Sequence, residues 1–292
     1  MPEGDTVWMT AQVLETGLAG KQLTGSDFRV PQLATVSLEG WTVTDSACYG
    51  KHLLLRLRKG DRSADKASER AVTLHSHLRM DGAWRVYGPG DRWAPKPRHT
   101  IRVVLKADDV TAVGYHLHEL KVVRAADEPQ LIAHLGPDLL GPNWDLFEAV
   151  RRLLSHADTP IAEALLDQRN LAGIGNLYKA ESLFVHGTWP WTPVRRVRDL
   201  PGLVTVAQKQ MMANLGRWTQ STTGSLLAGE ATFVYGRTGR SCRRCGTPIK
   251  CTDQAPLDLT GRPANTAERP RESSKGGERI TYWCPSCQAE RR

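Results

Sequence analysis

Two C-x-x-C pairs near the end of the chain constrain its fold more than any other feature. They are Cys242–Cys245 and Cys284–Cys287, and five of the six cysteines fall in the last 51 of 292 residues. Four thiolates in two such pairs suit a closed, tetrahedral structural zinc site. The 38-residue spacer exceeds the usual roughly 15–20 residues, but loop-closure cost grows only logarithmically with length. We therefore expect one structural Zn²⁺, against the alternatives of free thiols or a redox pair.

The charge of the chain points to its partner. Lys and Arg number 39 and Asp and Glu 31, a net charge of +8, and the residues from Gly236 onward contribute 12 − 6 = +6 of it. A basic excess of this size favours nucleic acid as the partner. The sequence contains neither an apolar run of bilayer length nor a signal-peptide pattern at its start. We expect a soluble, cytoplasmic monomer that does not bind membranes.

The first half of the chain has the pattern of a β-sandwich or barrel. Apolar residues at 7, 11, 14 and 18 have helical spacing, so we expect a helix capped by Asp5. Short strand-like runs such as "HLLLRLRKG", "AWRVYG" and "HTIRVVLKA" follow, separated by turn residues. We predict an N-terminal β-sandwich domain with flanking helices over residues 1–135. Two Gly-Pro steps then predict a linker over 136–145.

The second half is expected to be helical and to end in a zinc hairpin. Helical periodicity predicts a domain over residues 146–230, and the cysteine pairs fall in a further segment, 231–292. Residues 234–240 and 280–283 are the strand-like flanks of the expected hairpin. The stretch 252–277 is rich in Pro, Gly, Ser and charge, which predicts a flexible insertion. The fold class is therefore α+β.

A glycine-rich turn, "LAGIGN", joins two apolar helical segments, and the second begins at Asn176. Backbone N–H groups in such a turn, together with a helix N-terminus, suit a phosphate group. The alternative is an ordinary helical hairpin in which the glycines only permit close packing.

The start of the chain, "MPEGDT", places a proline and an acid directly after the initiator methionine. If Met1 is removed, Pro2 becomes a secondary amine beside Glu3. An α-amino group titrates near ~7.7–8.0, so a useful fraction is an uncharged nucleophile at neutral pH. The alternative is a featureless leader, since chain ends tolerate change.

Two further segments contain side chains whose roles the local sequence leaves open. Lys51 follows Gly50 before an apolar strand, where the ordinary interpretation is a solvated lysine at a turn. Met80 lies in "LHSHLRMDGAW", in an expected loop before a strand. A methionine usually fills a core, but a loop methionine in a DNA-processing enzyme can wedge between bases.

These residues together resemble the formamidopyrimidine-DNA glycosylase / endonuclease VIII family of base-excision repair enzymes. The resemblance covers the whole chain: "MPEG", Gly50–Lys51, the helix–two-turn–helix "AGIGNLYKAESLF", and Arg279 five residues before the third cysteine of a Cys₄ zinc β-hairpin. It implies a bifunctional DNA glycosylase and abasic-site lyase acting on damaged double-stranded DNA. The catalytic residues implied are Pro2 as nucleophile and Glu3 as general acid, with Lys51.

The resemblance also implies a DNA-binding set. Lys51, Asn176 and Arg279 would hold the phosphates around an extruded nucleotide. Met80, with Arg79 and His77, would fill the gap that the nucleotide leaves.

Local segments resemble the endonuclease VIII branch, which favours oxidised pyrimidines as substrates. "MPEGDT", "SHLRMDGAW" and "EALLDQRNLAGIGN" look like that branch, and "GYHLHELKVV" lacks the Arg-Arg-Phe loop of the other. Thr6 departs from many relatives, which carry Glu there. The rival interpretations are an oxidised-purine glycosylase of the same fold and an inactive relative that only binds damaged DNA. A small-molecule enzyme would not explain the basic tail, and a bare zinc-finger regulator would not explain the first 140 residues.

Overall fold

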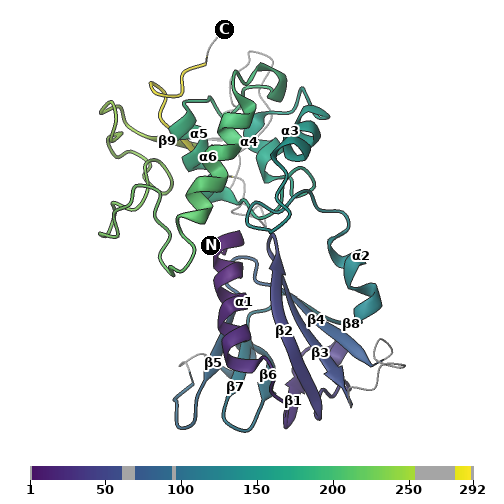
Figure 1. The fold of residues 1–292 in the computed structure, drawn as a ribbon. Coiled ribbons are helices and arrows are strands. Elements are labelled where there is room, and N and C mark those ends of the chain that lie inside the picture. The colour runs from purple at the N-terminus through teal and green to yellow at the C-terminus, as the bar shows by residue number, and fades with distance from the viewer. Residues whose placement is uncertain (1, 61–69, 94–96, 254–279, 291–292) are drawn as a thin grey trace. The chain divides into compact units, whose positions relative to one another are not determined.

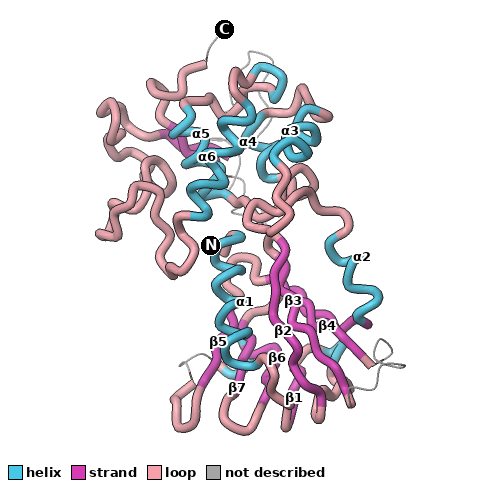
Figure 2. Tube along the Cα trace, viewed as in Figure 1, coloured by secondary structure: helices cyan, strands magenta, loops and turns pink. Residues whose placement is uncertain are grey.

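The computed structural model describes residues 2–60, 70–93, 97–253 and 280–290. The chain forms two compact units, Met1–His134 and Leu135–Arg292 (Figure 1). Figure 2 shows that the regular structure of the first unit is mostly strand and that of the second is mostly helix, joined by long loops. Among the described residues, every helix is too short or too polar to cross a membrane.

The N-terminal unit consists of two four-stranded antiparallel sheets, a long helix that packs on them and a short second helix. One sheet has the order β1-β6-β7-β5 and the other β2-β3-β4-β8, which confirms the predicted β-sandwich. Its elements are α1 (Gly4–Leu18), β1 (Gly25–Phe28), β2 (Trp41–Tyr49), β3 (His52–Lys59), β4 (Ala71–His77), β5 (Ala83–Tyr87), β6 (Ile101–Lys106), β7 (Thr111–Tyr115), β8 (Glu119–Arg124) and α2 (Glu128–Ile132).

The apolar core of this unit is formed by residues that follow the strand period of two and the helical period of 3.6. Leu53, Leu55 and Leu57 alternate along β3 and are buried to 1% exposure in the core. Leu14 and Leu18 of α1, one helical turn apart, are fully buried in the same core. The predicted cap was wrong, because the helix begins at Gly4 after Glu3, and Asp5 lies buried within its first turn.

The C-terminal unit is built around α5, the helix that follows the glycine-rich turn. Nine consecutive residues of α5, from its start, are buried, because other helices and the C-terminal hairpin surround it. The buried face of α6 packs on it in one apolar cluster. The helices are α3 (Leu146–Leu154), α4 (Ile161–Leu166), α5 (Asn176–His186) and α6 (Leu200–Met212), followed by the strands β9 (Lys250–Asp253) and β10 (Ile280–Trp283).

The hairpin differs from the prediction in its first strand. β10 lies where expected, but its partner is β9, and residues 234–240 form turns within the described part of the chain. The buried carboxylate of Glu181 explains the difference: it accepts hydrogen bonds from the backbone N–H groups of Phe233, Val234 and Tyr235 at 2.7–2.8 Å. These donors cannot also enter a β-ladder. Most of the predicted insertion, 254–277, lies outside the described residues.

Candidate active site and zinc centre

The second and third residues of the chain lie at the start of α1. Glu3 caps the helix: its carbonyl accepts the Val7 N–H at 3.0 Å, and the residue is completely buried. Pro2, beside it, is partly exposed. A helix N-terminus carries partial positive charge, which favours a carboxylate there. The proline that would carry the terminal amine if Met1 were removed therefore directly precedes a buried carboxyl residue at a helix start.

The packing of α1 on β2 brings this helix start to the end of the domain where β2 turns into β3. The Ser46 N–H donates to the Glu15 carboxylate at 2.6 Å, and the chain just after the helix hydrogen bonds the start of β2 (Figure 1). Helix and strand therefore run antiparallel. Twelve residues from Glu15 back to Glu3 span about 18 Å of helix, and four residues from Ser46 to Gly50 span about 13 Å of strand.

Gly50 and Lys51 form the two-residue turn between these strands. Tyr49 pairs with His52 across the turn, and φ is +54° at Gly50. A glycine with positive φ at the first central position is typical of a type II′ hairpin. Burial and then the charge of Lys51 lower the pKa of His77 to about 4. His77 also pairs with His52, the residue directly after Lys51, so Lys51 and His77 lie near each other at this end of the domain.

The predicted gap-filling residues lie at the end of β4 and in the turn that follows it. The Arg79 N–H donates to Nδ1 of His77 at 3.0 Å, and Arg79 has φ of +50°. Met80 is 47% exposed, so it is not core filler. The structure places Arg79 and Met80 on the turn and His77 at the end of β4, hydrogen bonded to that turn and close to Lys51.

Sequence reasoning missed a histidine cluster beside this turn. Nδ1 of His52 and Nε2 of His75 lie 2.8 Å apart with stacked rings, and the His77 ring meets His52 edge-on. Burial, and then the nearby His75 and His77, lower the pKa of His52 to about 3. His75 and His77 are two apart in a strand, which predicts one shared face. Whether these two rings contact His52 depends on the register between β3 and β4.

In the C-terminal unit, Asn176 is the first residue of α5. Side-chain hydrogen bonds hold the turn before it. Oε1 of Gln168 accepts the Gly173 N–H at 3.0 Å, and Nδ2 of Asn170 donates to the Ala164 carbonyl at 2.9 Å. Asn176 is 1% exposed, and its Oδ1 makes no hydrogen bond within the described residues. A buried amide with an unpaired oxygen at a helix N-terminus is a candidate ligand-binding group.

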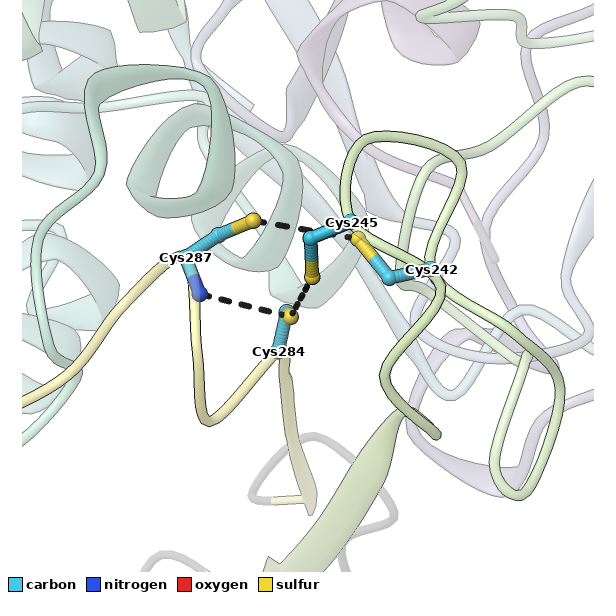
Figure 3. A group of neighbouring side chains, drawn as sticks. All are labelled: Cys242, Cys245, Cys284 and Cys287. Atoms are coloured by element: carbon cyan, nitrogen blue, oxygen red, sulfur yellow. Dashed lines mark hydrogen bonds between the residues drawn. The ribbon is translucent and has the colours of Figure 1, made fainter.

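The four cysteines come together, as their spacing predicts. Their sulfurs lie within 4.8 Å of one another, with Cys242 to Cys287 at 3.9 Å and Cys245 to Cys284 at 3.4 Å (Figure 3). Four sulfurs about 2.3 Å from a tetrahedral Zn²⁺ would be about 3.8 Å apart. The Arg244 N–H also approaches the Cys242 sulfur at 3.4 Å, the kind of contact that stabilises a thiolate.

The chemistry of this donor set also fits a metal ion. Burial raises the pKa of the Cys284 and Cys287 thiols. A dication that binds thiolates would offset that cost. The residues therefore fit one structural Zn²⁺. Cys48 and Cys251 lie outside the cluster.

Arg279 lies outside the described residues, but the strand that follows it is firmly held. Nζ of Lys179 donates to Oγ1 of Thr281 at 3.0 Å and to the Ile280 carbonyl at 3.3 Å. Lys179 is completely buried. Lys179 and Glu181 lie within the segment "AGIGNLYKAESLF", but the sequence assigned neither a role, and their roles are recognised only from their burial and partners.

The chain matches two domain models in the order seen in the structure. Residues 1–120 match the formamidopyrimidine-DNA glycosylase N-terminal domain, and residues 135–213 match the H2TH domain of the same glycosylase. The chain therefore belongs to the formamidopyrimidine-DNA glycosylase family, which confirms the resemblance drawn from its motifs.

Curated relatives extend over the whole chain and carry endonuclease 8 names. The "Probable endonuclease 8 2" of Streptomyces coelicolor is 48% identical, over 99% of this chain and 94% of the relative. The "DNA-(apurinic or apyrimidinic site) lyase Nei2" of Mycolicibacterium smegmatis is 42% identical, over 99% of each chain. Endonuclease 8 of Escherichia coli is 31% identical, over 99% of this chain and 100% of the relative. The predicted placement in the endonuclease VIII branch is thereby confirmed.

Solved structures share the fold at lower identity. The Fpg of Lactococcus lactis in complex with abasic-site DNA has a TM-score of 0.71 at 20% identity, covering 99% of this chain and 100% of that one. MutM in complex with DNA containing carbocyclic 8-oxo-G has a TM-score of 0.72 at 20% identity, with the same coverage.

Proposed function

We propose that this protein is a bifunctional DNA glycosylase and abasic-site lyase of base-excision repair. It acts on oxidised bases, mainly pyrimidines, in double-stranded DNA. One observation carries the proposal: Pro2 directly precedes a completely buried Glu3 at a helix start. The Gly50–Lys51 turn and the exposed Met80 belong to the same domain. Membership of the glycosylase family and relatives named endonuclease 8 or lyase support it.

Base removal begins at the terminal amine. The nitrogen lone pair of Pro2, freed by removal of Met1, forms a bond to C1′ as the bond from C1′ to the base breaks. The departing base takes up the proton that the nitrogen loses, which restores the lone pair that opens the sugar ring. Glu3 then protonates the sugar ring oxygen as the C1′–O4′ bond opens. The product is an iminium ion between Pro2 and C1′, so covalent catalysis divides one difficult step into easier ones.

Strand cleavage follows from the iminium. Because proline is a secondary amine, this ion carries a permanent positive charge and withdraws electrons. A proton leaves C2′ and the C3′–O bond breaks, which is β-elimination. Loss of the C4′ proton and of the C5′–O bond gives δ-elimination, and water releases the sugar fragment from Pro2.

The remaining candidate residues grip the DNA. C1′ of a stacked nucleotide cannot be reached inside a duplex, so the nucleotide must be extruded. Lys51, Asn176 and Arg279 hold phosphates of the extruded nucleotide and its neighbours. Met80, with Arg79 and His77, fills the gap in the duplex. The four cysteines hold one Zn²⁺, which folds the hairpin and takes no part in the reaction.

Borohydride trapping tests the proposal. Tag-free protein is mixed with a duplex carrying one oxidised pyrimidine, and the iminium is reduced to a stable adduct. We expect an adduct that peptide mapping assigns to Pro2, partial trapping with Pro2→Gly, and none when Met1 is retained. An adduct on another residue would overturn the Pro2 assignment.

Activity on duplexes with different lesions distinguishes this proposal from an oxidised-purine glycosylase and from an inactive DNA-binding relative. Greater activity on duplexes with oxidised purines would overturn the pyrimidine preference but keep the reaction. Absence of an adduct on both lesion and abasic duplexes, with binding retained, would identify a protein that only binds damaged DNA.

A further inference from the structure

Two neighbouring loops of the N-terminal domain share an uncommon backbone conformation. One is the turn 78–82, which carries Met80, and the other is the loop 116–118 between β7 and β8. Among the described residues, the only non-glycine residues with positive φ are Arg79 at +50° and His116 at +48°, one in each loop. Such conformations cost free energy and persist only where surrounding contacts hold them, often at functional sites.

Asp81 joins the two loops. One carboxylate oxygen lies 2.7 Å from Nε2 of His118, and the other lies 3.2 Å from Nδ1 of His116. The hydrogen bond from His118 is the main cause of the lowered pKa of Asp81. One side chain directly after Met80 thus binds both histidines of the neighbouring loop.

The Met80 turn is fixed at other points as well. The Gly82 N–H donates to the Leu78 carbonyl at 2.8 Å, and a Cβ at Gly82 would lie only 2.4 Å from that oxygen, so the turn can close only on a glycine. His77 accepts the Arg79 N–H. The Met80 side chain nevertheless remains 47% exposed. The backbone of the turn is therefore held from both sides, whereas its tip faces solvent.

We propose that Asp81 is a positioning residue that acts through Met80. Together with His116 and His118, it makes the two loops one rigid element that presents Met80 to the gap in the duplex. This inference rests on the proposed function. A side chain that must separate stacked bases works best when its backbone is already ordered, because the ordering cost is then met during folding.

The exposure of the contact makes the inference testable. About half of the Asp81 and His118 side-chain surfaces are solvent-accessible, and exposed ion pairs contribute only about 0–1 kcal/mol to folding. Asp81→Ala should therefore fold normally, and its effect on catalysis can be measured directly. Asp81→Asn keeps a hydrogen-bond acceptor without the charge and provides an intermediate variant.

The experiment is a double-mutant cycle of Asp81→Ala and Met80→Ala, read as the rate of base removal. On a fully paired lesion duplex, we expect Asp81→Ala to lower the rate about tenfold and to have less than about a twofold effect when added to Met80→Ala. On a duplex whose lesion is already looped out and unpaired, we expect Asp81→Ala to match the wild type. Asp109→Ala, which removes the exposed Lys21–Asp109 ion pair in the same domain, is the matched control.

Each outcome distinguishes the inference from the function it rests on. If the wild type releases no base, the proposed function is wrong. If the wild type is active and Asp81→Ala lowers the rate equally with and without Met80, Asp81 acts independently of Met80 and the inference is overturned. Unchanged activity of Asp81→Ala on the paired duplex would also overturn it.

Discussion

The ammonium nitrogen of Lys179 is completely buried and lies 3.0 Å from the hydroxyl of Thr281, which is 102 residues away in the chain. A buried ammonium is tolerated only when it is hydrogen bonded. This contact fixes β10 and its hairpin on α5. Asn176 lies three residues earlier on the same helix, so one turn of α5 carries both a candidate phosphate ligand and the support of the strand that follows Arg279.

Replacing Lys179 by methionine should loosen β10 while leaving the metal bound. The substitution leaves the Thr281 hydroxyl and the Ile280 carbonyl without this donor, so we expect a loss of about 1–3 kcal/mol in the free energy of unfolding. Urea denaturation measures it, with the exposed Lys209→Met as control. Equal stability of the two variants would contradict the role of Lys179.

Removing one zinc ligand should unfold the hairpin. In a Cys₄ site, metal-binding energy is folding energy, so we expect Cys284→Ser to lose Zn²⁺ and the Cys251→Ser control to keep one ion per chain. Elemental analysis and hydrogen exchange of residues 242–251 provide the measurement. Full metal content in Cys284→Ser would rule out this ligand set.

The conservative substitution Glu181→Gln should lower the stability of the fold. Each carboxylate oxygen accepts at least two hydrogen bonds, from Val234 and Tyr235 on one and from Phe233 and Thr222 on the other. In Glu181→Gln, the side-chain NH₂ group would replace one of these acceptor oxygens and would face N–H or O–H groups that are themselves donors. We expect the free energy of unfolding to fall by about 2–3 kcal/mol.

Chemical denaturation measures this loss, and Glu290→Gln, at an exposed position in the same unit, controls for the change of charge. A Glu181→Gln protein as stable as this control would show that the carboxylate is dispensable.

The stability of the N-terminal domain should fall with pH below neutrality. Burial lowers the pKa of His52 to about 3 and that of His77 to about 4, whereas an unfolded histidine titrates near about 6.5. Below about pH 6.5 the unfolded chain therefore binds more protons than the folded chain, and the free energy of unfolding falls as the pH drops toward about 4. Above about pH 6.5, the contribution of these neutral histidines to the free energy of unfolding is fully present.

Urea unfolding across this pH range measures the slope. His52→Gln should give a shallower slope than the wild type, because it removes one of the buried titrating rings. The exposed His99→Gln should leave the slope unchanged. A wild-type slope retained in His52→Gln would mean that other groups cause the acid sensitivity.

Local patterns in the sequence were sufficient wherever structure depends on spacing. The two C-x-x-C pairs predicted the four-sulfur cluster, the strand-like run "HLLLRLRKG" predicted β3, and "LAGIGN" predicted the start of α5 at Asn176. In each case the partners are close in sequence or share a fixed period. The family likewise followed from short motifs in a characteristic order.

Contacts between segments far apart in the chain could not be predicted from local sequence patterns. The strand predicted at residues 234–240 was wrong because Glu181, more than fifty residues earlier, takes its backbone donors. The burial of Lys179 and the bridge from Asp81 to His116 and His118 likewise depend on which elements pack together. Periodicity specifies which face of an element is apolar. Only the packed chain shows which distant polar groups must satisfy one another once water has been excluded.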